Sequence, residues 1–253
     1  MVTDTKIGII IQARLGSTRL PNKMVIPFYK GKSILTILVS DILKMYPETP
    51  VVLATTTNPV DDVLIESVKE LGVNIYRGSE NNVLKRFVDA AMHYELDYVV
   101  RICADNPFLD VKSIRELLDK MVVEKVDYTA WFFDNDLPSI KSHSGRYPEG
   151  ISVEALRKIM NTTIDSWFLE HVTNYIYTNP DTFNISRLMI KDQEFYRNIR
   201  LTVDTQSDFD IASEIYNLYV SRGISTESGF KELVLGREEL VGKMKNNIAQ
   251  NEK

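Results

Sequence analysis

The stretch KIGIIIQARLGSTRLPNK, from Lys6 to Lys23, joins an apolar run directly to a basic loop. The β-branched residues at 7–11 are typical of a strand that is buried on both faces of a parallel sheet. The loop then sets Arg14, Arg19 and Lys23 around a glycine and two hydroxyl side chains. Because guanidinium, ammonium and backbone N–H groups together bind anions, this stretch predicts a polyphosphate site at the end of a buried strand.

The rest of the first half alternates strand and helix patterns. Strands are expected at 50–54, 73–76 and 98–103, and helices at about 34–45, 61–71, 82–94 and 111–124. Such alternation predicts a parallel sheet with right-handed crossovers and helices on both faces. Ligands of these sheets bind beyond the carboxyl ends of the strands. The loops 12–23, 77–81 and 104–110 are therefore expected to share one rim.

The second half has a less regular pattern. Strands are expected at 128–133, 183–190 and 199–203, and helices at 165–177 and 206–219. No linker marks a domain boundary, so residues 1–253 are expected to form one α/β domain. Within it, residues 134–190 are predicted to be an insertion that covers the site or makes an oligomer contact, and 237–253 a charged, helical C-terminal tail.

Composition excludes several classes of partner. The formal net charge is -5 and the isoelectric point about 5.4, which argues against binding to nucleic acid or to an anionic membrane. The single cysteine, Cys103, excludes an internal disulfide and a multi-cysteine zinc site. No stretch approaches the roughly 18 to 20 apolar residues that a membrane span needs. A cytoplasmic protein is expected.

Two aspartates come directly after expected strands. Asp105 follows the strand at 98–103, and Asp204 follows the strand at 199–203. Each alone is also typical of a helix cap. Together, at one rim and beside a basic loop, they predict a site for Mg²⁺, which prefers oxygen ligands and shares them with substrate phosphates.

Three other patterns have simpler interpretations. The sequence GKS at 31–33 lacks the first glycine of a Walker A motif, because Ile26 stands there, so Ser33 is predicted to cap a helix. Ser17 has no evident base and is better explained as a phosphate-binding hydroxyl than as a nucleophile. His171 falls inside an expected helix, where a lone histidine is more often packed than catalytic.

Five ordered stretches resemble a known family. They are IIQARLGSTRLPNK, YRGSENNVLKRF, VVRICADNPFLD, YPEGISVEAL with EHVTNYI, and LTVDTQSDFD, and the resemblance covers about residues 6–220 in the same order. They are similar to the cytidylyltransferases that include the CMP-Kdo and CMP-acylneuraminate synthetases, and most closely to the SpsF-like branch of spore coat polysaccharide biosynthesis.

The resemblance implies a fold and an activity. The expected fold is that of the nucleotide-diphospho-sugar transferases, a GT-A-like, Rossmann-like and mostly parallel sheet flanked by helices. The expected reaction transfers CMP from CTP to a sugar acid or sugar phosphate with release of pyrophosphate, in surface glycan synthesis. Mg²⁺ is the implied cofactor, and a homodimer the implied assembly.

The resemblance also implies roles for individual residues. Catalytic roles fall to Arg14, Lys23 and Asp105, nucleotide contacts to Gln12, Ala13, Arg14, Gly16, Ser17, Arg19, Lys23, Arg77, Gly78 and Arg101, acceptor contacts to Glu149, Glu170 and His171, and Mg²⁺ ligation to Asp105 and Asp204. The chain departs from the family pattern at three positions. Asn22 and Ala104 stand where glycine is usual, and Leu169 stands where SpsF-like chains often have arginine.

Two other functions fit the same sequence. A glycosyltransferase on this fold would use a nucleotide-sugar donor and a metal on an Asp-x-Asp motif. One such match is DND at 134–136, in a polar loop where a turn is expected. A nucleotide-binding protein that has lost its chemistry is the third possibility, and the departures at Asn22, Ala104 and Leu169 are compatible with it.

Overall fold

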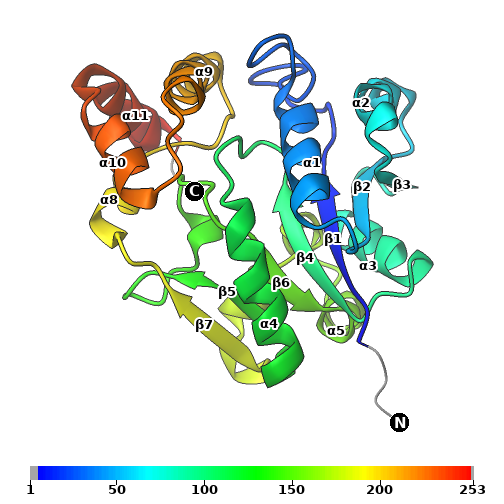
Figure 1. The fold of residues 1–253 in the computed structure, drawn as a ribbon. Coiled ribbons are helices and arrows are strands. Elements are labelled where there is room, and N and C mark those ends of the chain that lie inside the picture. The colour runs from blue at the N-terminus through cyan, green and yellow to red at the C-terminus, as the bar shows by residue number, and fades with distance from the viewer. Residues whose placement is uncertain (1–4, 252–253) are drawn as a thin grey trace.

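The computed structural model describes residues 5–251, and a mixed sheet runs through the middle of this part of the chain (Figure 1). The sheet is seven-stranded, in the order β3-β2-β1-β4-β6-β5-β7. The strands are β1 (Ile7–Gln12), β2 (Val51–Thr56), β3 (Asn74–Gly78), β4 (Tyr98–Cys103), β5 (Tyr128–Phe132), β6 (Glu149–Ser152) and β7 (Ile185–Met189). Among these, β6 runs antiparallel to its neighbours β4 and β5 and the other pairings are parallel, which confirms the expected mostly parallel α/β fold.

Strand β1 lies in the centre of the parallel half and is covered on both faces. Ile9 and Ile11 pack into one hydrophobic core, and Ile10, which points the opposite way, packs into the other. Gly8 leaves room for the Leu96 side chain, because a Cβ there would lie 2.4 Å from a methyl group of Leu96. Burial on both faces explains why the residues of β1 do not alternate between apolar and polar.

Helices flank both faces of the sheet. They are α1 (Ile34–Met45), α2 (Asp62–Val68), α3 (Val83–His93), α4 (Ile114–Glu124), α5 (Val153–Thr162), α6 (Ser166–Glu170), α7 (Asn174–Thr178), α8 (Gln193–Arg197), α9 (Gln206–Ser221), α10 (Glu227–Leu235) and α11 (Glu238–Gln250). Helices α1 and α4 contribute to the core of Ile9, while α3 and α5 contribute to that of Ile10. Ser33 caps α1 as predicted, its hydroxyl accepting from the Thr36 N–H at 3.2 Å. Helices α9, α10 and α11 pack together at one end of the molecule, orange to red in Figure 1.

Two expected elements are wrong in detail. The helix expected at 165–177 is broken in two, with His171 as the C-terminal cap of α6 rather than a residue inside a helix. The strand expected at 199–203 does not form. Instead, the Leu201 N–H donates to the His143 carbonyl and the Val203 N–H to the Asp105 carbonyl, both at 2.9 Å. These partners lie on two different loops, so no strand ladder forms and Asp204 lies in a loop rather than after a strand.

The two segments singled out in the second half are part of the same body. Residues 134–190 contribute β6 and β7 to the common sheet. The tail from 237 forms α11, whose Leu240 and Met244 are buried in the main core. Within residues 5–251, no helix combines the length and the apolar character that crossing a bilayer would require.

Candidate active site at the carboxyl ends of the strands

Lys23 lies at the centre of the rim, between the two aspartates that were expected to bind a metal. Its ammonium donates to Asp105 Oδ2 at 3.1 Å, to Asp204 Oδ1 at 3.0 Å and to the Val203 carbonyl at 2.6 Å. The side chain is 8% exposed, and burial by itself would lower the pKa of Lys23, but the two carboxylates outweigh burial and raise it. The ammonium is therefore charged at neutral pH. The contact between Lys23 and Asp105 also confirms that the loops 12–23 and 104–110 meet at one rim, as expected.

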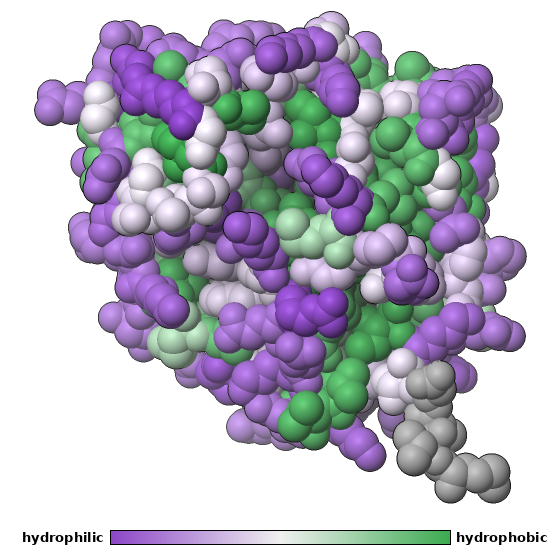
Figure 2. Space-filling model, viewed as in Figure 1, coloured by the Kyte–Doolittle hydropathy of each residue, from purple (hydrophilic) through white to green (hydrophobic). Residues whose placement is uncertain are grey.

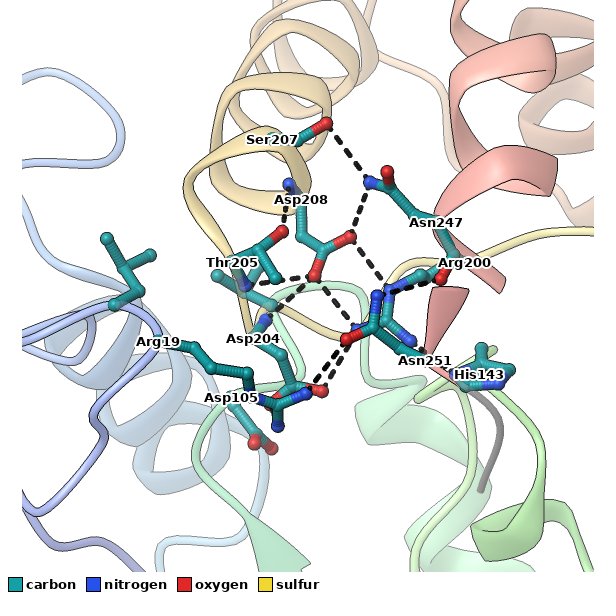
Figure 3. A network of polar contacts seen from close by, with 12 residues as sticks. Arg19, Asp105, His143, Arg200, Asp204, Thr205, Ser207, Asp208, Asn247 and Asn251 are labelled. Atoms are coloured by element: carbon teal, nitrogen blue, oxygen red, sulfur yellow. Dashed lines mark hydrogen bonds and ion pairs between the residues drawn. The ribbon is translucent and has the colours of Figure 1, made fainter. Parts of the chain in front are cut away.

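Behind Asp204 lies a buried network that the sequence did not identify as part of a site (Figure 3). Arg200 donates two hydrogen bonds to Asp208, at 2.8 and 2.9 Å, and a third to Asp204 Oδ2 at 3.1 Å. Burial alone would raise the pKa of Asp208, but Arg200 reverses the shift and holds it below the usual value. The sequence contains one local signal for Asp208, the spacing of Thr205 and Asp208, which form a capping box at the start of α9.

The basic loop brings two arginines to the same rim. Arg14 donates to Glu170 Oε1 at 2.9 Å and to the Glu80 carbonyl at 3.2 Å, so an expected nucleotide residue contacts an expected acceptor residue. Arg19 lies 3.4 Å from Asp204 Oδ1. Both guanidinium groups are substantially exposed, and ion pairs of that kind are weak enough for a ligand to replace them.

A second buried network lies beneath the rim. Arg101 pairs with Glu149 and donates to Gln12 Oε1 at 3.2 Å, and the Tyr128 hydroxyl also donates to Glu149. The side chains of Arg101 and Glu149 are 7% and 2% exposed. Because it is so deeply buried, Glu149 holds the Arg101 side chain in place, and Arg101 in turn contacts Gln12 below the site.

We expect Glu149→Gln to lower the free energy of unfolding by about 3 kcal/mol, because it leaves the buried Arg101 charge without its carboxylate. Urea denaturation measures this loss. Glu154→Gln, on the exposed face of α5, is the matched control and should change stability little. Wild-type stability together with a raised KM for the acceptor would instead mean that Glu149 contacts the acceptor directly.

The remaining expected site residues lie around the same rim in different surroundings. Arg77 is engaged within the protein, bonding the carbonyls of Thr56 and Asn58 and pairing with Asp62. Gly78 ends β3, and a Cβ there would lie 3.0 Å from both Arg86 and Tyr76. Ala13 is buried and Gly16 is exposed, while the Ser17 hydroxyl accepts from the Leu20 N–H at 3.4 Å.

His171 and Arg86 have pKa values that their surroundings lower. The His171 ring lies 4.0 Å from that of Trp167, and partial burial lowers its pKa, helped by Arg101 and opposed by Glu170. Arg86 is 1% exposed, and burial together with the neighbouring Arg14 lowers its pKa to about 10. Its guanidinium donates to the Ser79 carbonyl at 2.5 Å and so holds the loop that follows Gly78.

The departures from the family pattern have local explanations. Asn22 has a φ of 59°, in the left-handed region that glycine and asparagine adopt most readily, so it can take the place of the usual glycine. Its carbonyl accepts from the N–H groups of Val25 and Ile26. Ala104 is buried, and its N–H donates to the Gln12 carbonyl at 3.2 Å. Leu169 is partly buried and packs against the core that contains Ile10, where an apolar side chain fits.

Substitutions at Asn22 test this account. Asn22→Ala should lower the free energy of unfolding by about 1 to 2 kcal/mol, because a Cβ without a polar side chain is disfavoured at positive φ, while Asn22→Gly should be close to neutral. Urea denaturation of the two variants provides the comparison. Equal stability of the alanine and glycine variants would contradict a conformational role for Asn22.

The two aspartates fit a metal that is shared with a substrate. Within residues 5–251 there is no group of three or more histidine, cysteine, aspartate or glutamate side chains placed to hold an ion. Asp105 and Asp204 nevertheless converge on one nitrogen of Lys23. Mg²⁺ in nucleotide enzymes is usually held by one or two carboxylates together with phosphates and water, which is the donor set that this pair would supply.

A large cavity lies elsewhere. Its volume is about 1070 Å³, and it is lined by residues of α4, the end of β7 and the start of α10, with none of the expected site residues. Figure 2 shows the face seen in Figure 1, where hydrophilic side chains surround smaller apolar patches. We therefore assign the site from the converging charges and not from cavity size.

Comparison with known proteins gives matches along most of the chain. A family model described as Cytidylyltransferase matches residues 8–230. The chain is 35% identical over 206 residues to the uncharacterized protein MJ1063 of Methanocaldococcus jannaschii, with 81% of each chain covered. It is 29% identical over 212 residues to the spore coat polysaccharide biosynthesis protein SpsF of Bacillus subtilis, with 82% of this chain and 85% of SpsF covered.

Solved structures share the fold. A cytidylyltransferase from Leptospira borgpetersenii superposes with a TM-score of 0.80 at 27% identity, covering 96% of this chain and 98% of that one. A CMP:2-keto-3-deoxy-manno-octonic acid synthetase in complex with CTP superposes with a TM-score of 0.63 at 15% identity, covering 85% and 99%. At that identity the second likeness concerns the fold alone.

Proposed function

This chain belongs to the cytidylyltransferase family and is a CTP-dependent nucleotidyltransferase, and from that premise we propose that it transfers CMP to a sugar acid or a sugar phosphate with release of pyrophosphate. The similarity to SpsF supports a place in polysaccharide biosynthesis. The observation that carries the proposal is the convergence of Lys23, Asp105 and Asp204 at the strand ends, beside the arginines of the basic loop.

The basic loop would bind the triphosphate. An acceptor oxygen attacks the α-phosphorus in line, a bond to that phosphorus forms, and the bond to the bridging oxygen of the β-phosphate breaks. Arg14, Arg19 and Lys23 neutralise the pyrophosphate that leaves, and the protein contributes mainly positioning and charge, as is general for phosphoryl transfer. Lys23 would exchange its carboxylate partners for phosphate oxygens when the nucleotide binds.

Asp105 and Asp204 would hold a divalent cation, which we propose to be Mg²⁺. Such an ion supplies Lewis-acid stabilisation of the charge on phosphate oxygens. The buried pair of Arg200 and Asp208 keeps the Asp204 side chain oriented toward the rim. The two aspartates therefore have complementary surroundings, since Asp105 is the more exposed and Asp204 the more rigidly held.

The acceptor would lie beside Glu170 and His171. Arg14 contacts Glu170 and so links this region to the nucleotide side. The lowered pKa of His171 keeps the imidazole neutral at pH 7, so that it can accept a hydrogen bond from an acceptor hydroxyl. A homodimer formed through residues 134–190 is part of the proposal, supported by the position of β7 at one edge of the sheet.

Pyrophosphate release tests the function. We would incubate the purified chain with each of four NTPs, Mg²⁺ and a panel of sugar acids and sugar phosphates. Release that requires CTP and one class of acceptor supports the proposal. In a parallel incubation with nucleotide-sugar donors, release of a nucleoside diphosphate would favour a glycosyltransferase. Tight CTP binding without turnover across the panel would favour a non-catalytic protein.

A further inference from the structure

The C-terminal helix α11 contacts the candidate active site, although it lies beyond residues 8–230 that match the family. Its inner face is apolar, with Leu240 and Met244 buried in the core against α9 and α10. Asn247 and Asn251 lie one turn apart at its end and point toward the rim, Asn247 toward Asp208 and Asn251 toward Arg19 (Figure 3). The helix thus has one face for the core and a short polar edge for the site.

Asn247 contacts the network that orients Asp204. Its amide donates to Asp208 Oδ1 at 2.9 Å and to the Ser207 hydroxyl at 3.1 Å. Asp208 in turn accepts from Arg200 and from the backbone N–H of Asp204, at 3.1 Å. These groups share the buried carboxylate of Asp208. Loss of the Asn247 amide would therefore loosen the Asp208 side chain and, through Arg200, the Asp204 side chain.

Asn251 contacts the cationic side of the site. Its Oδ1 accepts from Arg19 Nη1 at 3.1 Å, and its own amide donates to the Asn247 carbonyl at 3.0 Å. The Arg19 side chain is 54% exposed and also pairs weakly with Asp204 at 3.4 Å, so loss of the Asn251 contact would let its guanidinium sample more positions over the rim. Asn251 therefore restricts a long side chain that is expected to bind the triphosphate.

We propose that α11 is a functional part of the nucleotide site, with Asn247 positioning Asp204 through Asp208 and Arg200, and Asn251 positioning Arg19. The inference rests on the proposed function, because it assumes that CTP binds at this rim. It assigns separate effects to two asparagines one turn apart: Asn247 acts on the metal-dependent part of CTP binding, and Asn251 on the metal-independent part.

The test measures CTP affinity of the full chain by calorimetry, without acceptor, once with Mn²⁺ and once with EDTA. The gain from Mn²⁺ is the factor by which the CTP affinity in Mn²⁺ exceeds that in EDTA. Asn247→Ala should leave the affinity in EDTA unchanged and make this gain about 10-fold or more smaller, since groups that orient metal ligands typically account for about 10- to 100-fold in metal affinity. Asn251→Ala should weaken binding several-fold in EDTA and leave the gain from Mn²⁺ unchanged. Asn246→Ala, an exposed neighbour of the same type, should match the wild type in both conditions.

Two further results decide between positioning and simple packing. Asn247→Asp keeps the size of the side chain but sets a carboxylate against Asp208, so it should reduce the Mn²⁺ gain more than alanine does. If both alanine variants lose only thermal stability, or if they behave like Asn246→Ala, the inference is overturned. If the wild type binds CTP but gains nothing from Mn²⁺, the role of Asn247 is overturned. If the wild type binds no CTP in either condition, the proposed function itself fails.

Discussion

Lys23→Met is expected to lower turnover about 100- to 1,000-fold while the chain stays folded. Methionine keeps a flexible stem of similar length but carries no charge, so the leaving pyrophosphate loses a preorganised cation. The ammonium contacts both Asp105 and Asp204, whose side chains are 27% and 15% exposed. Because both carboxylates keep some contact with water, losing these bonds should cost about 1 to 3 kcal/mol of unfolding free energy. Initial rates of pyrophosphate release and urea denaturation measure the two effects.

The same substitution should increase the affinity of the nucleotide-free protein for Mn²⁺. In the wild type the Lys23 ammonium occupies the space between the two carboxylates and so competes with a metal cation for them. Lys32→Met, which removes an exposed lysine near the start of α1, is the matched control and should alter neither turnover nor Mn²⁺ binding. A wild-type rate in Lys23→Met would exclude this lysine from the chemistry, and a lower Mn²⁺ affinity would exclude the competition.

Asp105→Asn is expected to lower turnover by at least about 100-fold, because even changes in groups that surround a metal ligand typically cost about 10- to 100-fold. Asparagine keeps the shape of the side chain but not its charge. The fold should persist, because the Asp105 backbone carbonyl still accepts from the Val203 N–H at 2.9 Å and Lys23 keeps its bonds to Asp204 and to the Val203 carbonyl. Turnover measured over a range of Mg²⁺ concentrations should recover in part at high Mg²⁺.

Asp119→Asn is the control for this loss of charge. Asp119 is an exposed aspartate on α4, outside the rim, and its replacement should leave the rate and its Mg²⁺ dependence unchanged. Full activity of Asp105→Asn at ordinary Mg²⁺ would remove Asp105 from the proposed metal pair. A variant that fails to fold would contradict the structural argument, which a circular dichroism spectrum decides independently of activity.

The predictions from sequence were most accurate where local pattern and burial agree. β4 was expected at 98–103 and lies there, because three of its six residues are apolar and β-branched, a composition typical of a buried strand. The cap at Ser33 was also found from a local signal. The alternation of such elements is sufficient to predict a mostly parallel sheet and the rim at which its loops meet.

The predictions failed where partners are distant in the chain. Residues 199–203 have the composition of a strand, yet their N–H groups donate to the carbonyls of His143 and Asp105, more than fifty residues away, and form no ladder. The helix expected at 165–177 breaks at His171 for a reason that its apolar spacing did not reveal. Spacing describes which face of an element is apolar, and it does not say which other segment will lie against that face.

The sequence by itself determined the alternation of strands and helices in the first half, the strand and basic loop from Lys6 to Lys23 and the resemblance to a family, because each depends on short motifs of residues close together in the chain. Only the tertiary structure decided that Lys23 is ion-paired with both aspartates and that Arg200 and Asp208 stand behind Asp204. It alone brought Asn247 of the C-terminal tail to the same network. The physical reason is that an ion pair or a hydrogen bond depends on distances between side chains, which folding sets and sequence spacing does not.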